Sequence, residues 1–362
     1  MTMASEQVMV LPGTPGWKSG LLEPESFRDE ATFTNPLYHG ADPWVTQHAG
    51  SYYLCQAGPG GCIEVWKSDT LTHRGERQVI WTPPRHGWNR EEVWAPELHR
   101  IGGRWYIYYA ASDGSNCNHR MGVLESVTND PQGAYIDRGQ LYTGDDVIGR
   151  ADNRWAIDGT LLQLRDQLYF IWSGWADERD IQHLYIARMS DPVTIASNRV
   201  RLCDNDTHLW ERVAESHHQR GLNEGPQLLV RRGRIFLIYS CSGSWQATYK
   251  LGMLCMNESA DPMDPASWRK SARPVFESTP EIFGVGHCCF TQSPDGEEDW
   301  ILYHSKRDRR EGWDRVVRAQ PFEWRANGFP HFGVPSETTE LAVPSGDPGR
   351  GDRSPRPLPR AA

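Results

Sequence analysis

Strand-like hydrophobic runs, each following a short polar turn, recur five times along the chain. The runs are rich in Tyr, Trp, Phe, Ile and Leu, and such residues suit the pleated, half-buried surface of a strand. They cover residues 51–54, 104–109, 167–172, 234–239 and 299–303. Because self-similarity at intervals of 53 to 67 residues is typical of repeat architectures, we interpret each run as part of one repeated unit.

A second hydrophobic run follows each of the first ones, at residues 62–66, 121–125, 183–187, 250–254 and 315–319. Turns rich in Asp, Pro and Gly come next, as at 129–133 and 261–265. This rhythm predicts antiparallel sheets, and no long helical periodicity interrupts it. The unit has the length of a four-stranded blade, so the sequence predicts an all-β protein with a five-bladed β-propeller fold. A tandem of β-sandwiches is the alternative fold.

The two ends of the chain differ from the repeats. Residues 1–30 are punctuated by Pro and Gly and are expected to form an N-terminal extension. Residues 31–340 are expected to form the propeller domain. Residues 341–362 are dominated by Pro, Gly, Arg and Asp, which cannot build a core, so we expect a flexible C-terminal tail there.

The net charge limits the possible binding partners, and the lack of long apolar runs bears on the cellular location. The formal net charge of −9 argues against nucleic acid and against anionic membranes, because both need clustered Lys and Arg. The one basic cluster, at 307–310, is diluted by acids and is expected to be a solvated loop. No apolar run is long enough for a transmembrane helix, and residues 1–20 show no signal peptide. We therefore expect a cytoplasmic protein, or a secreted one if a leader was removed.

Composition adds two further expectations. The eight cysteines include no C-x-x-C pair and no zinc-binding spacing, so we expect reduced thiols. The 16 tryptophans must mostly pack in the core. Because the C–H faces of sugar rings are apolar, this abundance is also a weak indication of a carbohydrate ligand.

An ionisable residue lies upstream of each of the five aromatic runs. These residues are Asp42, Glu97, Asp158, Glu224 and His287. If the blades surround an axis, the five side chains are expected to converge at one end of it. Crowded carboxylates in a dehydrated site push one pKa up and leave another acid ionised, as glycoside hydrolysis requires. No Walker sequence, nucleophile elbow or H-E-x-x-H motif suggests a different chemistry.

The motifs around these residues resemble glycoside hydrolase family 43, a family of inverting five-bladed propeller enzymes. The resemblance extends from about residue 33 to about residue 335. It is carried by the segments Ala-Asp-Pro at 41–43, Trp-Ala-Pro-Glu at 94–97, Ile-Asp-Gly at 157–159, Asn-Glu-Gly-Pro at 223–226 and Gly-His at 286–287. Five short motifs in this order and at blade spacing are far more specific than any one of them.

The resemblance implies roles for the residues that match. Asp42 would be the general base that activates water, Glu224 the general acid, and Asp158 the carboxylate that tunes and positions the acid. His287 would lie near a bound ion in the central channel, which implies one structural calcium ion as the only cofactor. Arg318 would reach the sugar hydroxyls or the acidic cluster.

Finer likenesses, as at 94–99, 119–121, 171–175 and 312–315, point to exo-acting α-L-arabinofuranosidases that release L-arabinose from arabinan or arabino-oligosaccharides. Candidate sugar contacts are Trp94, Glu97, Trp172, Trp175 and His39, and His119 could also line the funnel. A β-xylosidase, a β-D-galactofuranosidase and an endo-1,5-α-arabinanase remain alternatives within the family. A propeller that binds carbohydrate or protein without turnover is the alternative from another class.

Overall fold

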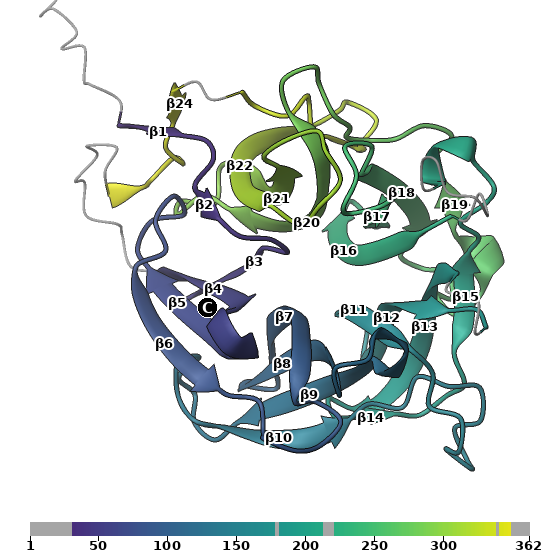
Figure 1. The fold of residues 1–362 in the computed structure, drawn as a ribbon. Coiled ribbons are helices and arrows are strands. Elements are labelled where there is room, and N and C mark those ends of the chain that lie inside the picture. Colours follow the sequence, from purple (N-terminus) through teal and green to yellow (C-terminus); the bar gives the residue numbers. More distant parts are fainter. Residues whose placement is uncertain (1–30, 178–180, 213–220, 338–339, 349–362) are drawn as a thin grey trace, which may run out of the picture.

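Five antiparallel sheets surround a central axis, which confirms the predicted five-bladed propeller (Figure 1). The computed structural model describes residues 31–177, 181–212, 221–337 and 340–348. The expected N-terminal extension, residues 1–30, lies outside these ranges. Within them, no helix is long and apolar enough to cross a membrane, and the only helices are four single 3-10 turns, η1 (Pro59–Gly61), η2 (Asn116–Asn118), η3 (Leu209–Glu211) and η4 (Pro265–Ser267).

Each of the first four blades is built from strands that are consecutive in the sequence. The first strand lies nearest the axis, and the later ones lie progressively farther out. The first blade contains β3 (Trp44–His48), β4 (Ser51–Ala57), β5 (Ile63–Ser68) and β6 (Glu76–Trp81). The second contains β7 (Glu91–Ile101), β8 (Arg104–Ser112), β9 (Arg120–Ser126) and β10 (Tyr135–Gln140). The third contains β11 (Ala156–Leu164), β12 (Gln167–Trp175), β13 (Gln182–Asp191), β14 (Thr194–Ile195) and β15 (Val200–Cys203). The fourth contains β16 (Asn223–Arg231), β17 (Arg234–Cys241), β18 (Lys250–Asn257) and β19 (Arg269–Lys270).

The fifth blade combines the two ends of the propeller and so closes the ring. It contains β20 (Phe283–Gln292), β21 (Asp299–Lys306), β22 (Arg315–Trp324) and β23 (Pro330–His331), and β2 (Tyr38–His39) pairs with β22 from the N-terminal side. Next to β2, the side chain of Asn35 hydrogen-bonds both the N–H and the C=O of Ala319, at 3.0 and 2.8 Å. The amide side chain thus extends the strand pairing by one step.

The described structure continues past residue 341, where the sequence suggested the start of a flexible tail. Strand β24 (Glu340–Ala342) pairs with β1 (Thr32–Thr34), and the side chains of Val343 and Asp347 are buried. The boundary expected at residue 341 was therefore wrong, because a short apolar segment there covers the junction between the first and fifth blades. Residues 349–362 lie outside the described ranges.

The five aromatic runs form the second strand of each blade, and the following runs form the third. Both faces of these strands are covered by neighbouring blades, which explains continuous hydrophobic runs such as Ile107, Tyr108 and Tyr109, all fully buried. The buried residues form five main clusters, one at each interface between adjacent blades. All eight cysteines are free, as expected.

A β-bulge near the axis interrupts the innermost strand of blades two to five. In β7, β11 and β16, for example, the register shifts between Trp94 and Glu97, between Ile157 and Thr160, and between Glu224 and Gln227. Each bulge contains a residue with positive φ, namely Ala95, Asp158, Gly225 and His287, and Asp42 in the first blade also has positive φ. Because a bulge redirects the side chains beside it, these positions decide what faces the axis.

Candidate active site

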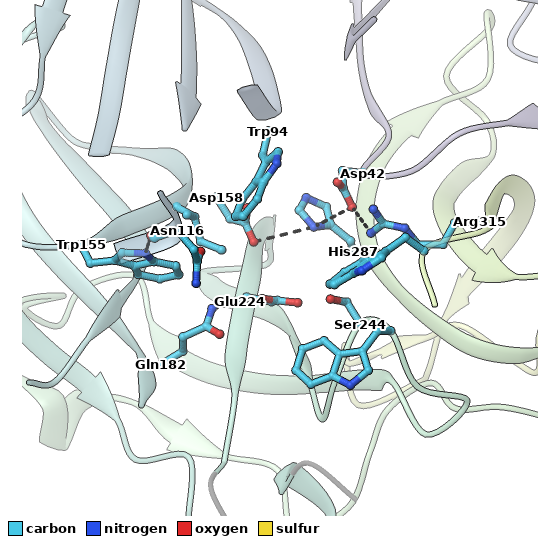
Figure 2. Close-up of a pocket in the computed structure, with 13 residues that line it drawn as sticks. Asp42, Trp94, Asn116, Trp155, Asp158, Gln182, Glu224, Ser244, His287 and Arg315 are labelled. Atoms are coloured by element: carbon cyan, nitrogen blue, oxygen red, sulfur yellow. Dashed lines mark hydrogen bonds and ion pairs between the residues drawn. The ribbon is translucent and has the colours of Figure 1, made fainter. Parts of the chain in front are cut away.

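A cavity of about 520 Å³ opens at the end of the axis where the bulges lie (Figure 2). Its walls combine ionisable groups and tryptophans, which is the composition expected of a site that binds a polar ring with apolar faces. The lining residues are Asp42, Trp94, Asn116, Trp155, Ile157, Asp158, Gln182, Glu224, Ser244, Trp245, His287, Trp313 and Arg315. Four of the five converging residues that the sequence predicted are among them.

The bulges explain why the fifth residue, Glu97, lies outside the cavity. Aligned by register, Asp158 and His287 occupy the bulge position, and Glu224 lies one residue before it. Glu97 lies two residues after the bulge, at the position that Gln227 takes in the fourth blade. The buried Glu97 carboxylate accepts hydrogen bonds from Gln227 and from His99 Nε2, the latter at 2.8 Å. Glu97 is thus a structural group below the site, and the predicted substrate contact was wrong.

Asp42 is surrounded by positive charge and hydrogen-bond donors. Its Oδ1 lies 3.1 Å from Arg315 Nη1, 3.1 Å from His304 Nδ1 and 3.3 Å from His287 Nδ1. Burial alone would raise the pKa of Asp42, but Arg315, His287 and His304 together outweigh burial and hold it well below its usual range. Asp42 is therefore ionised at any physiological pH.

Glu224 has a different environment, made of neutral donors. Tyr249 Oη donates to Glu224 Oε1 at 2.8 Å, and Gln182 Nε2 donates to Oε2 at 3.1 Å. Burial raises the pKa of Glu224, and these two hydrogen bonds only partly offset it. The site therefore contains one carboxyl group held ionised and one biased toward the protonated form.

Asp158 is the third acid in the cavity lining. Its Oδ2 accepts a hydrogen bond from the Gly225 N–H at 3.1 Å and lies 3.8 Å from His287 Nδ1. Burial is the main cause that raises the pKa of Asp158 to about 7, and the charges of Glu224 and Asp42 add to it. The contact with the Gly225 amide ties Asp158 to the peptide that follows Glu224.

His287 bridges the carboxylates, as Figure 2 shows. Burial would lower its pKa, but Asp42, Asp158 and Glu224 outweigh burial and raise it. His287 offers a ring nitrogen, whereas calcium prefers oxygen ligands, so His287 would lie near such an ion rather than bind it directly. No group of three or more His, Cys, Asp or Glu that could hold a metal ion occurs in the described ranges. The calcium ion stays a prediction.

Trp94 and Trp155 form an aromatic wall of the cavity. Of the three tryptophans predicted to contact sugar, Trp94 belongs to this wall, Trp175 lies behind it and Trp172 lies in the core. Trp94 lines the cavity and stacks on the buried ring of His119, with centroids 3.8 Å apart, so His119 supports the wall from behind. Trp175 stacks in the same way behind Trp155, at 4.7 Å. Trp172 is 0% exposed in the core between blades two and three, so its predicted sugar contact was wrong.

The side chains of His39 and Arg318, which were also predicted to contact the sugar, do not line the cavity. His39 lies on β2 and pairs with Asp314 at 2.8 Å in an exposed position outside the cavity lining. Arg318 is buried, and its guanidinium donates to Ser305 Oγ at 2.9 Å and to the Ser336 carbonyl at 3.1 Å. Arg315, three residues earlier on β22, is the arginine that faces the acids. An odd separation on a strand places two side chains on opposite faces, so only one of them could reach the axis.

Sequence reasoning missed several residues that complete the site. Besides Arg315, they are Tyr249, Gln182 and His304, which hold Glu224 or Asp42, and Asn116, Ser244 and Trp245 in the cavity lining. These residues come from strand ends and loops, and the sequence gives no signal for most of them. His304 was detectable in principle, because it pairs in register with Gly286, next to the predicted His287.

Comparisons with known proteins agree with this geometry. The sequence profile described as Glycosyl hydrolases family 43 matches residues 33–330. The extracellular exo-α-(1→5)-L-arabinofuranosidase of Streptomyces avermitilis is 33% identical over 339 residues, or 89% of this chain and 66% of that protein. The enzyme of the same name from Streptomyces chartreusis is 34% identical over 287 residues, covering 76% of this chain and 83% of that protein. This chain therefore spans just under two thirds of the length of the Streptomyces avermitilis relative.

A solved structure is also similar over nearly the whole fold. The crystal structure of an α-L-arabinofuranosidase from Lactobacillus brevis has a TM-score of 0.76 and 33% sequence identity, and the match covers 85% of this chain and 98% of that one. A thermostable family-43 glycoside hydrolase, at 22% identity and a TM-score of 0.65, shares the fold. The sequence match, the five-bladed fold and the three converging acids lead to one conclusion: this chain belongs to glycosyl hydrolases family 43.

Proposed function

We propose that the protein is an inverting, exo-acting α-L-arabinofuranosidase that releases L-arabinose from arabinan or arabino-oligosaccharides. One observation carries the catalytic part of the proposal: Asp42 and Glu224 face the same cavity with pKa values shifted in opposite directions. Glycosidases need this asymmetry, because one carboxyl group must deliver a proton while the other stays ionised.

Glu224 is the proposed general acid. Its carboxyl group, held by Tyr249 and Gln182, would protonate the oxygen that joins the released sugar to the rest of the substrate. Proton delivery leaves Glu224 ionised, and the Tyr249 hydroxyl then stabilises the new charge. Asp158, which accepts a hydrogen bond from the Gly225 N–H, would position the acid, while burial and the charge of Asp42 keep Glu224 protonated.

Asp42 is the proposed general base. In its ionised form it would take a proton from a water molecule that attacks the anomeric carbon from the face opposite the leaving group. Arg315 and His304 contact its Oδ1, so the carboxylate is fixed in orientation before substrate binds. A single displacement of this kind inverts the anomeric configuration.

The sugar and the exo mode are supported by the comparisons. The Streptomyces relatives are named exo-α-(1→5)-L-arabinofuranosidases, and the Lactobacillus brevis structure is that of an α-L-arabinofuranosidase. The other family activities remain alternative outcomes of the assay. The cytoplasmic location finds no support in the comparisons, since both Streptomyces relatives are named extracellular. The absence of nucleic-acid binding stays a prediction from net charge.

The test is hydrolysis of 4-nitrophenyl α-L-arabinofuranoside by the wild type and by Asp42→Asn. We expect activity in the wild type and a loss of roughly 10³-fold in the variant, because the proton acceptor is gone. The base variant is more informative than a Glu224 variant, because nitrophenolate leaves with little acid assistance. NMR of the first-formed sugar should show the β-anomer.

Two results would count against the proposal. Full activity of Asp42→Asn, with wild-type thermal stability as the control for folding, would exclude the assigned base. A wild type inactive on the arabinoside but active on a xyloside or a galactofuranoside would replace the sugar and keep the mechanism.

A further inference from the structure

One tryptophan that lines the cavity is exposed to solvent. Trp313 lies in the loop between β21 and β22 and is 63% exposed. Among the large hydrophobic side chains that are exposed in the described part of the chain, it alone lines the cavity. An exposed aromatic side chain that lines a binding cavity offers a flat apolar ring to a ligand.

The loop that carries Trp313 is fixed by contacts with the fourth blade. The Gly312 N–H donates to the Trp245 carbonyl at 2.9 Å, and Gln246 Nε2 donates to Glu311 Oε1 at 2.8 Å. Lys306 Nζ also donates to the Gly312 carbonyl at 2.5 Å. The bonds of Gly312 with Trp245 and of Gln246 with Glu311 tie together two loops that each place one tryptophan at the cavity, and the Lys306 bond fixes the Trp313 loop to its own strand.

The two rings form a continuous apolar edge. The centroids of Trp245 and Trp313 are 5.7 Å apart with an angle of 53° between the ring planes. The guanidinium of Arg315 lies 5.4 Å from the Trp313 centroid, and the same guanidinium binds Asp42. The rim tryptophan is thus held in place from one side by a group of the site itself. An ordered platform loses little conformational entropy when a ligand binds.

We propose that Trp313, with Trp245 beside it, forms the subsite for the leaving-group sugar, which stacks on the rim as an α-linked pentose ring. The inference rests on the proposed function. The sugar to be released would occupy the cavity with Asp42 and Glu224, so the remainder of the substrate would extend toward solvent. On the solvent side, the lining offers the exposed ring of Trp313 with Trp245 beside it.

The experiment compares Trp313→Ala with the wild type on two substrates. One is α-1,5-linked arabinobiose, whose leaving group is a pentose, and the other is methyl α-L-arabinofuranoside, whose leaving group is too small to reach the rim. We expect kcat/KM to fall about tenfold more on the disaccharide than on the methyl glycoside, as loss of one stacked aromatic contact implies. Trp313→Phe, which keeps a ring, should recover most of the difference.

The possible outcomes separate this inference from the proposed function. Equal losses on both substrates, or no loss on either, would overturn the leaving-group subsite. A wild type that hydrolyses neither arabinoside would overturn the arabinofuranosidase proposal instead. The loss of kcat/KM in Trp313→Ala would then be measured on xylobiose and on methyl β-D-xyloside. A larger loss on the disaccharide would support the leaving-group subsite, and equal losses would refute it.

Discussion

At the scale of single residues, the proposed acid Glu224 and the proposed base Asp42 are linked through two buried side chains, Tyr249 and His304. Tyr249 donates to Glu224, and its ring stacks on His304 with centroids 5.4 Å apart and ring planes within 9°. His304 in turn contacts Asp42 at 3.1 Å. Both side chains are fully buried. The two carboxyl groups are thus oriented by one packed unit, which restricts both at once.

Tyr249→Phe should expose the contribution of this hydroxyl to the acid. The hydrogen bond favours ionised Glu224, so its loss should raise the pKa of Glu224 further. The alkaline limb of the kcat/KM profile on arabinobiose should therefore move to higher pH. At the optimum, kcat should fall by about tenfold, because the carboxyl group is less well oriented.

Tyr303→Phe is the matched control, since this tyrosine is also fully buried but bonds Gln320, away from the cavity. It should change stability and leave the position of the alkaline limb unchanged. A Tyr249→Phe enzyme with the wild-type pH profile would show that the hydroxyl does not act on the acid.

At the scale of elements, the strands could be predicted from the sequence, whereas the bulges left a weaker signal. Hydrophobic runs covered on both faces stand out in the sequence, and each became the second strand of a blade. The bulges shift the register by a residue, so Glu224 faces the cavity while Glu97 does not. A signal was present, because Pro or Gly follows the positive-φ residue in four of the five blades. Such residues are typical of bulges, where a ladder donor is absent or the backbone is strained.

The bulge in β11 also stores strain at a functional position. Asp158 has a φ of 54°, which is unfavourable for most side chains, and its carboxyl group is buried near two other acids. Asn tolerates this backbone conformation and can still accept the Gly225 N–H, but it carries no charge. We therefore expect Asp158→Asn to increase stability and to lower activity.

The gain in unfolding free energy from Asp158→Asn should increase with pH. Burial raises the pKa of Asp158 from 3.8 to about 7, so between these values the folded state binds more protons than the unfolded state. Wild-type stability attributable to this group therefore falls as pH rises from about 4 to about 7. Urea unfolding should show a variant more stable by roughly 1–4 kcal/mol at pH 8 and nearly equal at pH 4.

The exposed turn residue Asp166 supplies the control for this measurement. Asp166→Asn should leave the difference in unfolding free energy near zero at both pH values. A destabilised Asp158→Asn protein at pH 8 would mean that the charge of Asp158 is needed by the fold, and the proposed trade-off between stability and activity would be incorrect.

At the scale of the whole molecule, the propeller depends on a closure made by chain ends that are distant in sequence. The first four blades are built from local hairpins, whereas the fifth takes β2 from the N-terminal side, and the pairing of β1 with β24 covers the neighbouring junction. Phe33, on β1, packs against Trp300 of the fifth blade with centroids 6.0 Å apart. Asp42 lies three residues after the end of β2 and contacts His287 and Arg315 of the fifth blade, so the closure also assembles the base.

Asn35→Ala tests the closure without touching the cavity. Asn35 is 1% exposed, and its side chain satisfies both backbone groups of Ala319, so the substitution leaves a buried donor and a buried acceptor unpaired. We expect unfolding free energy to fall by about 2–4 kcal/mol, measured by urea denaturation, with the exposed Asn129→Ala as the control. In the variant, the propeller should open first where Asp42 meets the fifth blade. Activity should therefore be lost at a lower urea concentration than most of the circular dichroism signal of the β-sheets. Simultaneous loss of activity and sheet signal would show instead that the closure has no stability of its own and unfolds only with the five blades together.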